Sequence, residues 1–229
     1  MHADSPSTAP ASPWYRELAR RMRYLWPVKA LGTAAVIALF FQAYFYLLRH
    51  PGGEVVTMPL IALDRWVGFT PWAFPVYASL WVYVSLAPAL MGNFRGLLRY
   101  GLWACLMCLL CLAWFWVFPT KVPDFDVDWS AHPGMAFLKG VDSAGNAFPS
   151  LHVASAVFAA YWVRRLLQAL RAPRGWVLAS DLYGLAIVWS TLATLQHVAL
   201  DAIAGAAVGA LFAWLSLRRP AGVLAAPRR

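Results

Sequence analysis

Two short polar segments interrupt the long apolar stretches of this sequence, and both carry histidine. Ser150 and His152 stand at the start of one apolar run, and His197 and Asp201 stand between two others. Because His197 and Asp201 are four positions apart, a helix would place them on one face. The carboxylate can then accept a hydrogen bond from one ring nitrogen and leave the other nitrogen free as a base or nucleophile.

The segment around Ser150 has features of an anion site. The apolar run that begins at residue 148 predicts a helix, and the free amides and positive dipole at a helix start attract negative charge. With the acid of His152 beside it, this predicts a phosphate site. Two plainer roles fit the same residues: Ser150 as no more than the cap of the helix, and His197 with Asp201 as no more than a polar pair that joins helices.

The composition places these segments in a membrane protein. Of the 229 residues, 61% are hydrophobic and 13% are charged, which is typical of membrane-embedded chains. The formal charge is +9, but the basic residues lie in short links between apolar runs. A nucleic-acid surface needs its charges on one water-exposed face, so we expect no nucleic-acid partner.

The apolar runs predict an all-α, polytopic membrane protein with a bundle of six transmembrane helices. We expect a disordered and then basic amphipathic segment at residues 1–29, a membrane domain at 30–217 and a basic tail at 218–229. The first helix should act as an uncleaved anchor. The expected spans are residues 31–48, 72–91, 100–118, 148–163, 177–195 and 198–217.

Charge counting predicts the orientation of this bundle. With six spans, fifteen of the nineteen Lys and Arg residues fall on the side of the two termini. Cytoplasmic loops are enriched in these residues, so both termini are predicted to be cytoplasmic. Both histidine segments then face outward, and a bacterial inner membrane with a periplasmic site is the expected location.

These segments resemble two motifs of the type 2 phosphatidic acid phosphatase superfamily, whose enzymes have a six-helix membrane core. The middle motif, Pro-Ser-x-His, matches residues 149–152. In the last motif Ser190, His197 and Asp201 match, while Thr191 stands where arginine is usual. The resemblance covers about residues 55–217.

The first motif of that family is incomplete in this chain. Lys121 matches its opening, but Asp128 and Trp129 occupy the spacing at which Arg-Pro is expected. Leu151, in place of the usual glycine, and residues 63–71 resemble the branch that includes inositol phosphorylceramide synthases. That branch also tends to lack the arginine of the last motif.

The resemblance implies a mechanism for a lipid phosphate substrate. His197 would attack phosphorus, Asp201 would orient it, and His152 would protonate the departing alkoxide. No metal or other cofactor is expected. The phosphate oxygens would be held by Lys121, Ser150, Thr191 and the backbone N–H of Leu151.

Three functions follow from this pattern. The first is a membrane phosphatase that transfers the phosphoryl group to water. The second is a lipid phosphotransferase that moves a phosphoryl group or phospho-headgroup to another lipid or sugar, which the missing arginines favour. The third is a transporter or scaffold without catalysis, which retention of both histidines argues against.

Several other residues have simpler interpretations. Lys139 is a lesser candidate for phosphate binding, and Asp124, Asp126 and Asp128 lack the rest of a calcium loop, so no metal site is predicted. Gly205 and Gly209 permit close helix packing, either within the bundle or between the chains of a homo-oligomer. The cysteines are expected to be small packing residues at positions 105, 108 and 111.

Overall fold

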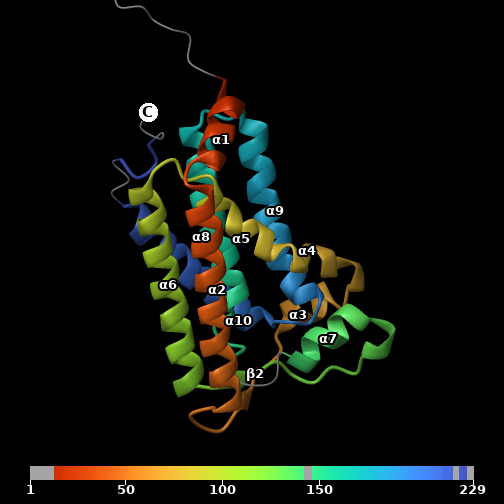
Figure 1. Ribbon diagram of the computed structural model, residues 1–229. Coiled ribbons are helices and arrows are strands. Elements are labelled where there is room, and N and C mark those ends of the chain that lie inside the picture. Colours follow the sequence, from red (N-terminus) through yellow and green to blue (C-terminus); the bar gives the residue numbers. More distant parts are fainter. Residues whose placement is uncertain (1–12, 142–145, 219–221, 226–229) are drawn as a thin grey trace, which may run out of the picture.

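The chain forms an elongated helical bundle with two very short strands at one end (Figure 1). The computed structural model describes residues 13–141, 146–218 and 222–225. All but the last residue of the stretch expected to be disordered, residues 1–13, therefore lies outside it. The helices are α1 (Trp14–Arg23), α2 (Trp26–Arg49), α3 (Ala62–Val67), α4 (Phe74–Ala78), α5 (Leu80–Ala89), α6 (Phe94–Val117), α7 (Pro133–Val141), α8 (Leu151–Ala169), α9 (Arg174–Ala193) and α10 (Ala199–Leu217). The strands are β1 (Val56–Thr57) and β2 (Thr120–Lys121), and 3₁₀ turns cover Pro71–Ala73 and Trp129–Ala131.

Four of these helices are long and apolar enough to cross a membrane. Within the described part of the chain they are α2, α6, α9 and α10. The helical fold class is confirmed, whereas a count of six transmembrane helices is not. The two remaining expected spans correspond to the buried helix α8 and to the pair α4 and α5.

The span expected at residues 72–91 is broken. After the 3₁₀ turn at Pro71–Ala73, α4 ends at Ala78 and α5 begins at Leu80. Between them, the Ser79 hydroxyl donates to the Val76 carbonyl at 2.6 Å, which competes with the helical backbone bonds. Sequence periodicity did not reveal this interruption because the break is a single polar residue in an apolar run.

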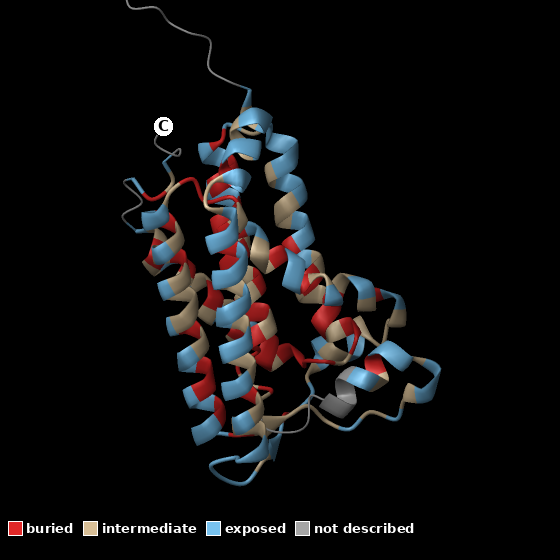
Figure 2. Ribbon diagram, in the orientation of Figure 1, coloured by how far each residue is buried: buried red, intermediate tan, exposed pale blue. Residues whose placement is uncertain are grey.

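Helix α8 is the centre of the molecule and packs against α5, α6, α9 and α10. Phe158, Trp162 and Leu166 of this helix are almost fully buried, and Figure 2 shows buried residues gathered inside the bundle. The Trp162 indole donates to the Ser216 hydroxyl of α10 at 2.9 Å. The helix continues to Ala169, beyond residue 163, at which the expected span ends. In this added part, the Arg164 guanidinium pairs with Asp181 of α9 at 2.6 Å.

Two glycines allow α10 to lie directly against the backbone of α8. A Cβ added at Gly205 would stand 2.3 Å from the Ser150 carbonyl oxygen, and one added at Gly209 would stand 2.4 Å from that of Ala154. These contacts belong to the first of the two packing alternatives, within the bundle. Association of two chains through this face stays a prediction, although α8 already covers the two glycines.

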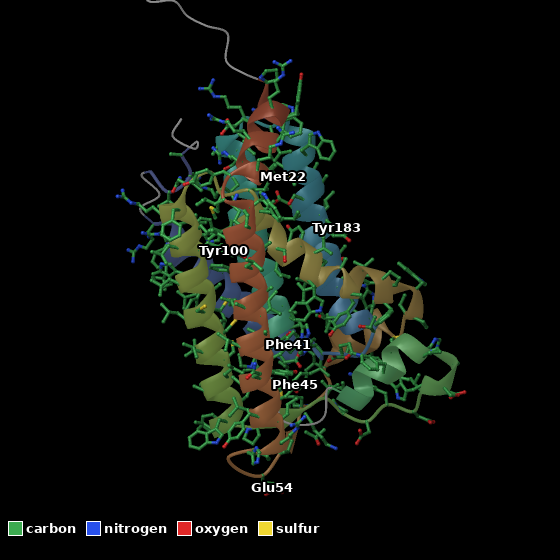
Figure 3. The ribbon with its side chains drawn as sticks, viewed as in Figure 1. Met22, Phe41, Phe45, Glu54, Tyr100 and Tyr183 are labelled. Atoms are coloured by element: carbon green, nitrogen blue, oxygen red, sulfur yellow. The ribbon has the colours of Figure 1, made fainter. Side chains whose placement is uncertain are left out.

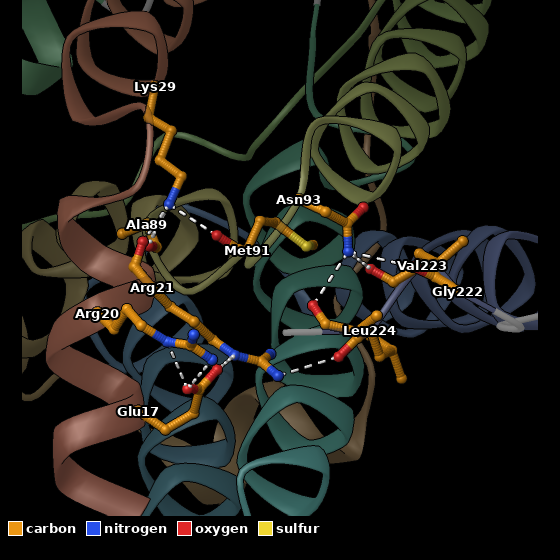
Figure 4. A network of polar contacts seen from close by, with 11 residues as sticks. Glu17, Arg20, Arg21, Lys29, Ala89, Met91, Asn93, Gly222, Val223 and Leu224 are labelled. Carbon is orange, nitrogen blue, oxygen red and sulfur yellow. Dashed lines mark hydrogen bonds and ion pairs between the residues drawn. The ribbon is translucent and has the colours of Figure 1, made fainter. Parts of the chain in front are cut away.

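A buried lysine ties together several segments at the other end of the bundle (Figure 4). The Lys29 ammonium donates to the carbonyl oxygens of Arg21 at 2.7 Å, Ala89 at 2.9 Å and Met91 at 2.8 Å. The Arg21 guanidinium in turn donates to the Leu224 carbonyl at 3.1 Å. The start of α2, the end of α5 and the C-terminal segment are therefore joined at the end where α1 lies.

The α8–α10 contact can be tested with Gly209→Ala. The added methyl meets backbone, which cannot yield as a flexible side chain does, so we expect a loss of roughly 1–3 kcal/mol in stability and a lower thermal unfolding midpoint in detergent. Gly32→Ala is the control, because a Cβ at Gly32 meets nothing within 4 Å. Equal unfolding midpoints for the two variants would contradict the tight contact.

Candidate functional site

The two histidine segments meet, and their side chains form a hydrogen-bonded chain. His197 Nδ1 lies 3.1 Å from Asp201 Oδ2, and His197 Nε2 lies 3.0 Å from His152 Nδ1. His152 Nε2 lies 3.1 Å from the hydroxyl oxygen of Tyr77. The residues come from α4, from the start of α8 and from the start of α10, so only the folded chain assembles them.

The direction of the protons in this chain follows from its acidic end. An ionised carboxylate only accepts, so Asp201 accepts a hydrogen bond from His197 Nδ1–H, and His197 Nε2 carries the lone pair. That lone pair accepts from His152 Nδ1–H. In a neutral His152 ring, Nε2 then accepts from the Tyr77 hydroxyl. A histidine with a lone pair on Nε2 can act as a nucleophile, and here the hydrogen-bond donor of a second histidine lies next to it.

His197 is held by the sharp turn between α9 and α10. The Thr191 carbonyl accepts from both the Gln196 and His197 amides at 3.1 Å, and Leu195 adopts a left-handed conformation with φ of 54°. The Thr191 hydroxyl donates to the Val188 carbonyl at 2.8 Å. Thr191 is fully buried and shapes the turn, with its hydroxyl proton already engaged.

Ser150 links the two halves of the site through the backbone. Its amide donates to the Asp201 carbonyl oxygen at 2.9 Å, and its hydroxyl accepts from the Val153 amide at 3.2 Å. Ser150 is therefore the N-cap of α8, as the plainer interpretation had it, and it is fully buried. Leu151 opens α8, where the first amides have no partner within the helix.

The segment before α4 braces the turn that carries His197. Asp64 Oδ1 accepts from the Ala199 amide at 2.7 Å, and its Oδ2 accepts from the Ile61 amide at 2.8 Å. The Thr70 amide donates to the Ala193 carbonyl at 2.7 Å, close to the end of α9. Residues 61–70 thus fix both sides of the turn. The sequence resemblance pointed to this segment but not to its structural role.

Lys121 lies at the same end of the bundle but is engaged elsewhere. Its ammonium pairs with Asp124 at 3.0 Å and is about one third exposed, and within the described residues it makes no hydrogen bond to either histidine. Its strand nevertheless adjoins the segment before Ser150, since Thr120 accepts from the Ala147 and Phe148 amides through its carbonyl and hydroxyl oxygens. The side chain of Lys139 lies outside the described residues.

The position at which the first motif should continue is used for a turn. Asp128 caps the short 3₁₀ helix Trp129–Ala131, and its carboxylate accepts from the Ser130 hydroxyl at 2.5 Å and from the Ser130 amide at 3.0 Å. These hydrogen bonds lower the pKa of the Asp128 carboxyl group. An acidic turn therefore replaces the basic group that the motif would place there.

Sequence reasoning missed Tyr77 and Trp81, which surround His152. Besides the hydrogen bond, the Tyr77 ring centroid lies 5.4 Å from that of His152, and Trp81 lies 6.2 Å away, edge to face. Both residues belong to an aromatic-rich apolar run in which nothing distinguishes them. Only the position of α4 and α5 beside α8 reveals their role.

Two buried polar atoms near His197 have no hydrogen-bond partner within the described residues. They are Asp201 Oδ1 and Gln196 Nε2. Buried polar groups are normally satisfied, so such atoms call for an explanation. Gln196 precedes His197 in the sequence, and its side-chain amide is a potential donor in a protein that lacks the arginine of the last motif.

Comparison with known proteins agrees with this geometry. The family model described as PAP2 superfamily matches residues 60–215, a range that contains every residue of the hydrogen-bonded chain. Searches of curated proteins and of solved structures gave no match. Because the family model covers more than half of the sequence, the chain belongs to the PAP2 superfamily.

Proposed function

We propose that this protein hydrolyses a lipid-linked phosphate at the outer membrane–water interface through a phosphohistidine on His197. The observation that carries the proposal is the hydrogen-bonded chain of Asp201, His197 and His152. Membership of the PAP2 superfamily supports phosphatase-type or phosphotransferase-type activity. The four apolar helices and the family together indicate an integral membrane protein.

In the first step, His197 Nε2 attacks phosphorus. A bond forms between nitrogen and phosphorus, and the bond from phosphorus to the lipid oxygen breaks. His152 enters this step as the imidazolium, with a proton on both ring nitrogens, gives one proton to the departing oxygen and becomes neutral. Asp201 accepts from His197 Nδ1–H, which stabilises the positive charge that develops on the ring. The phosphoryl group must enter between the two rings, so His152 moves away from its present 3.0 Å contact when substrate binds.

In the second step, water takes the phosphoryl group. Its oxygen bonds to phosphorus, the bond to His197 breaks, and the water proton passes to His152, which is then ready for another cycle. Phosphoryl transfer depends mainly on positioning and charge stabilisation. The rigid turn around His197 and the brace from Asp64 serve the first of these needs.

Charge stabilisation rests on few groups. Each hydrogen bond from a charged donor is worth about 1.5–3 kcal/mol, so the two missing arginines leave a considerable deficit. Three kinds of donor remain. They are the backbone amides at the start of α8, among them that of Leu151; the side-chain amide of Gln196; and Lys121, once it is released from Asp124. Ser150 and Thr191 are expected to contribute through the backbone they hold.

We place the site on the periplasmic side of a bacterial inner membrane, with both termini cytoplasmic. The charge distribution supports this orientation, since most Lys and Arg residues fall on the side of the termini. The geometry is compatible with it, because α1 and the C-terminal segment meet at the end of the bundle near Leu170, away from the start of α8.

A phosphotransferase is the second candidate, and one observation favours it. The acidic turn at Asp128 and the buried Thr191 occupy the positions of both usual arginines. The branch that includes inositol phosphorylceramide synthases, which this sequence resembles, also tends to lack the arginine of the last motif. In such an enzyme a lipid or sugar hydroxyl replaces water in the second step.

His197→Ala tests the nucleophile. Without the ring no phosphoryl intermediate forms, so we expect release of phosphate from a lipid phosphate to fall by about a thousandfold or more. His50→Ala, at the exposed end of α2, is the matched control and should retain activity. Unchanged phosphate release by purified His197→Ala would refute the proposal.

Tyr77→Phe tests the contact with His152. The variant keeps the ring and loses one hydrogen bond to the proton donor, so we expect kcat to fall about tenfold with little change in KM. Tyr83→Phe is the control, because Tyr83 is equally buried on the adjacent helix and donates to the Ser180 carbonyl at 3.0 Å, outside the site. An equal loss of kcat in both variants would point to general destabilisation.

The acceptor can be identified with a phospholipid labelled in its phosphate. A hydrolase should release labelled phosphate or labelled headgroup into water, whereas a phosphotransferase should produce a new labelled lipid when a second lipid alcohol is present. Thin-layer chromatography of the lipid fraction separates the two. Label that appears only in a new lipid would overturn hydrolysis in favour of transfer.

A further inference from the structure

A large apolar cavity lies beside the proposed catalytic centre. It has a volume of about 1110 Å³ and is formed between α2 on one side and α5, α6 and α8 on the other. His152 lines it toward one end and Lys29 lines it near the other. Between these two residues the lining is almost entirely hydrophobic, so the cavity is suited to hydrocarbon.

The length of the cavity can be measured along α2. Phe41 lies level with the proposed catalytic centre, because Trp81 contacts both the Phe41 ring at 5.2 Å and the His152 ring at 6.2 Å between centroids. From Phe41 back to Lys29, at about 1.5 Å per residue, the cavity extends for about 18 Å. A lipid chain in one leaflet occupies about half of the roughly 30 Å hydrocarbon core, so one extended chain fits.

The two ends of the cavity differ in character. At the far end, Lys29 donates to the Arg21 carbonyl and to the carbonyls of Ala89 and Met91, which tie α2 to the end of α5 across that end of the cavity. At the near end, His152 presents its ring to the cavity. Figure 3 shows Phe41 and Phe45 of α2 toward this near end and Tyr100 of α6 farther along the bundle.

We propose that this cavity binds one extended hydrocarbon chain of the lipid phosphate substrate and limits its length. The phosphate lies between His152 and His197, and the chain runs along α2 toward Lys29. The inference rests on the proposed function, since it places the phosphate of the same molecule at the histidines. The expected substrates are lipid phosphates that have one long hydrocarbon chain free to enter the cavity.

Gly101 provides the means to shorten the cavity. It lines the cavity from α6, and a Cβ added there meets nothing within 4 Å. Its neighbour Tyr100 packs on Phe158, with ring centroids 5.2 Å apart. Phe158 is six residues, or about 9 Å, along α8 from His152. A bulky side chain at Gly101 should therefore block the deeper part and spare the part next to the histidines.

The test compares hexadecyl phosphate with hexyl phosphate as substrates in mixed micelles. The wild-type protein should prefer hexadecyl phosphate, measured as kcat/KM. In Gly101→Trp the kcat/KM for hexadecyl phosphate, divided by that for hexyl phosphate, should fall by at least about tenfold. Displacing about two methylenes of the long chain from the cavity already costs that much. Gly101→Leu should give a smaller fall. Leu109→Trp, on an exposed face of the same helix outside the cavity, should keep the wild-type ratio.

Each result decides the proposal. If Gly101→Trp releases phosphate with the wild-type ratio of kcat/KM values, the chain site is refuted and the proposed hydrolase activity still stands. Parallel losses for both substrates would also overturn it, because a structural lipid and not the substrate chain would then fill the cavity. Binding of radiolabelled hexadecyl phosphate gives a readout independent of turnover. Weaker binding to Gly101→Trp with no phosphate release by the wild type would support the chain site and refute the hydrolase.

Discussion

The site depends on Asp201 of α10, which joins the turn that carries His197 to the start of α8, which carries His152. Its carboxylate accepts from His197, and its backbone carbonyl accepts from the Ser150 amide at the start of α8. The carboxylate is fully buried, and a buried charge is stable only with close partners. The short distance between α8 and α10 is possible because Gly205 has no side chain at the crossing.

Much of this arrangement could be predicted from the sequence. Hydropathy gave the positions of α2, α6, α9 and α10, and the spacing of His197 and Asp201 gave their contact, because a four-residue separation fixes side-chain proximity locally. The break at Ser79 could not be predicted, since one hydroxyl bonded to its own helix leaves no periodic trace. The contacts of Tyr77 and Asp64 could not be predicted either. Tyr77 is separated from His152 by 75 residues in the sequence, and Asp64 is separated from Ala199 by 135 residues.

The same distinction between local and distant contacts explains the uncertain phosphate ligands. Ser150 and Thr191 occupy motif positions, yet both hydroxyls bond to nearby backbone and stabilise the helix start and the turn. Lys121 occupies its motif position and pairs with Asp124. A motif records which residue stands at a position, whereas the free energy of binding phosphate depends on which donors remain unengaged after folding.

Helix α2 has an unusual relation to the rest of the bundle. Only 11% of the apolar stretch of α2 is buried. Lipid provides no hydrophobic force that would press this helix against its neighbours. Lys29 fastens one end to the end of α5, while Tyr44 and the strand pair β1–β2 fasten the other. The helix is thus fixed at both ends, and between them it lines the cavity shared with α5, α6 and α8. A bend in α2 between these two attachments would therefore widen or narrow the cavity while leaving both ends of the helix in place.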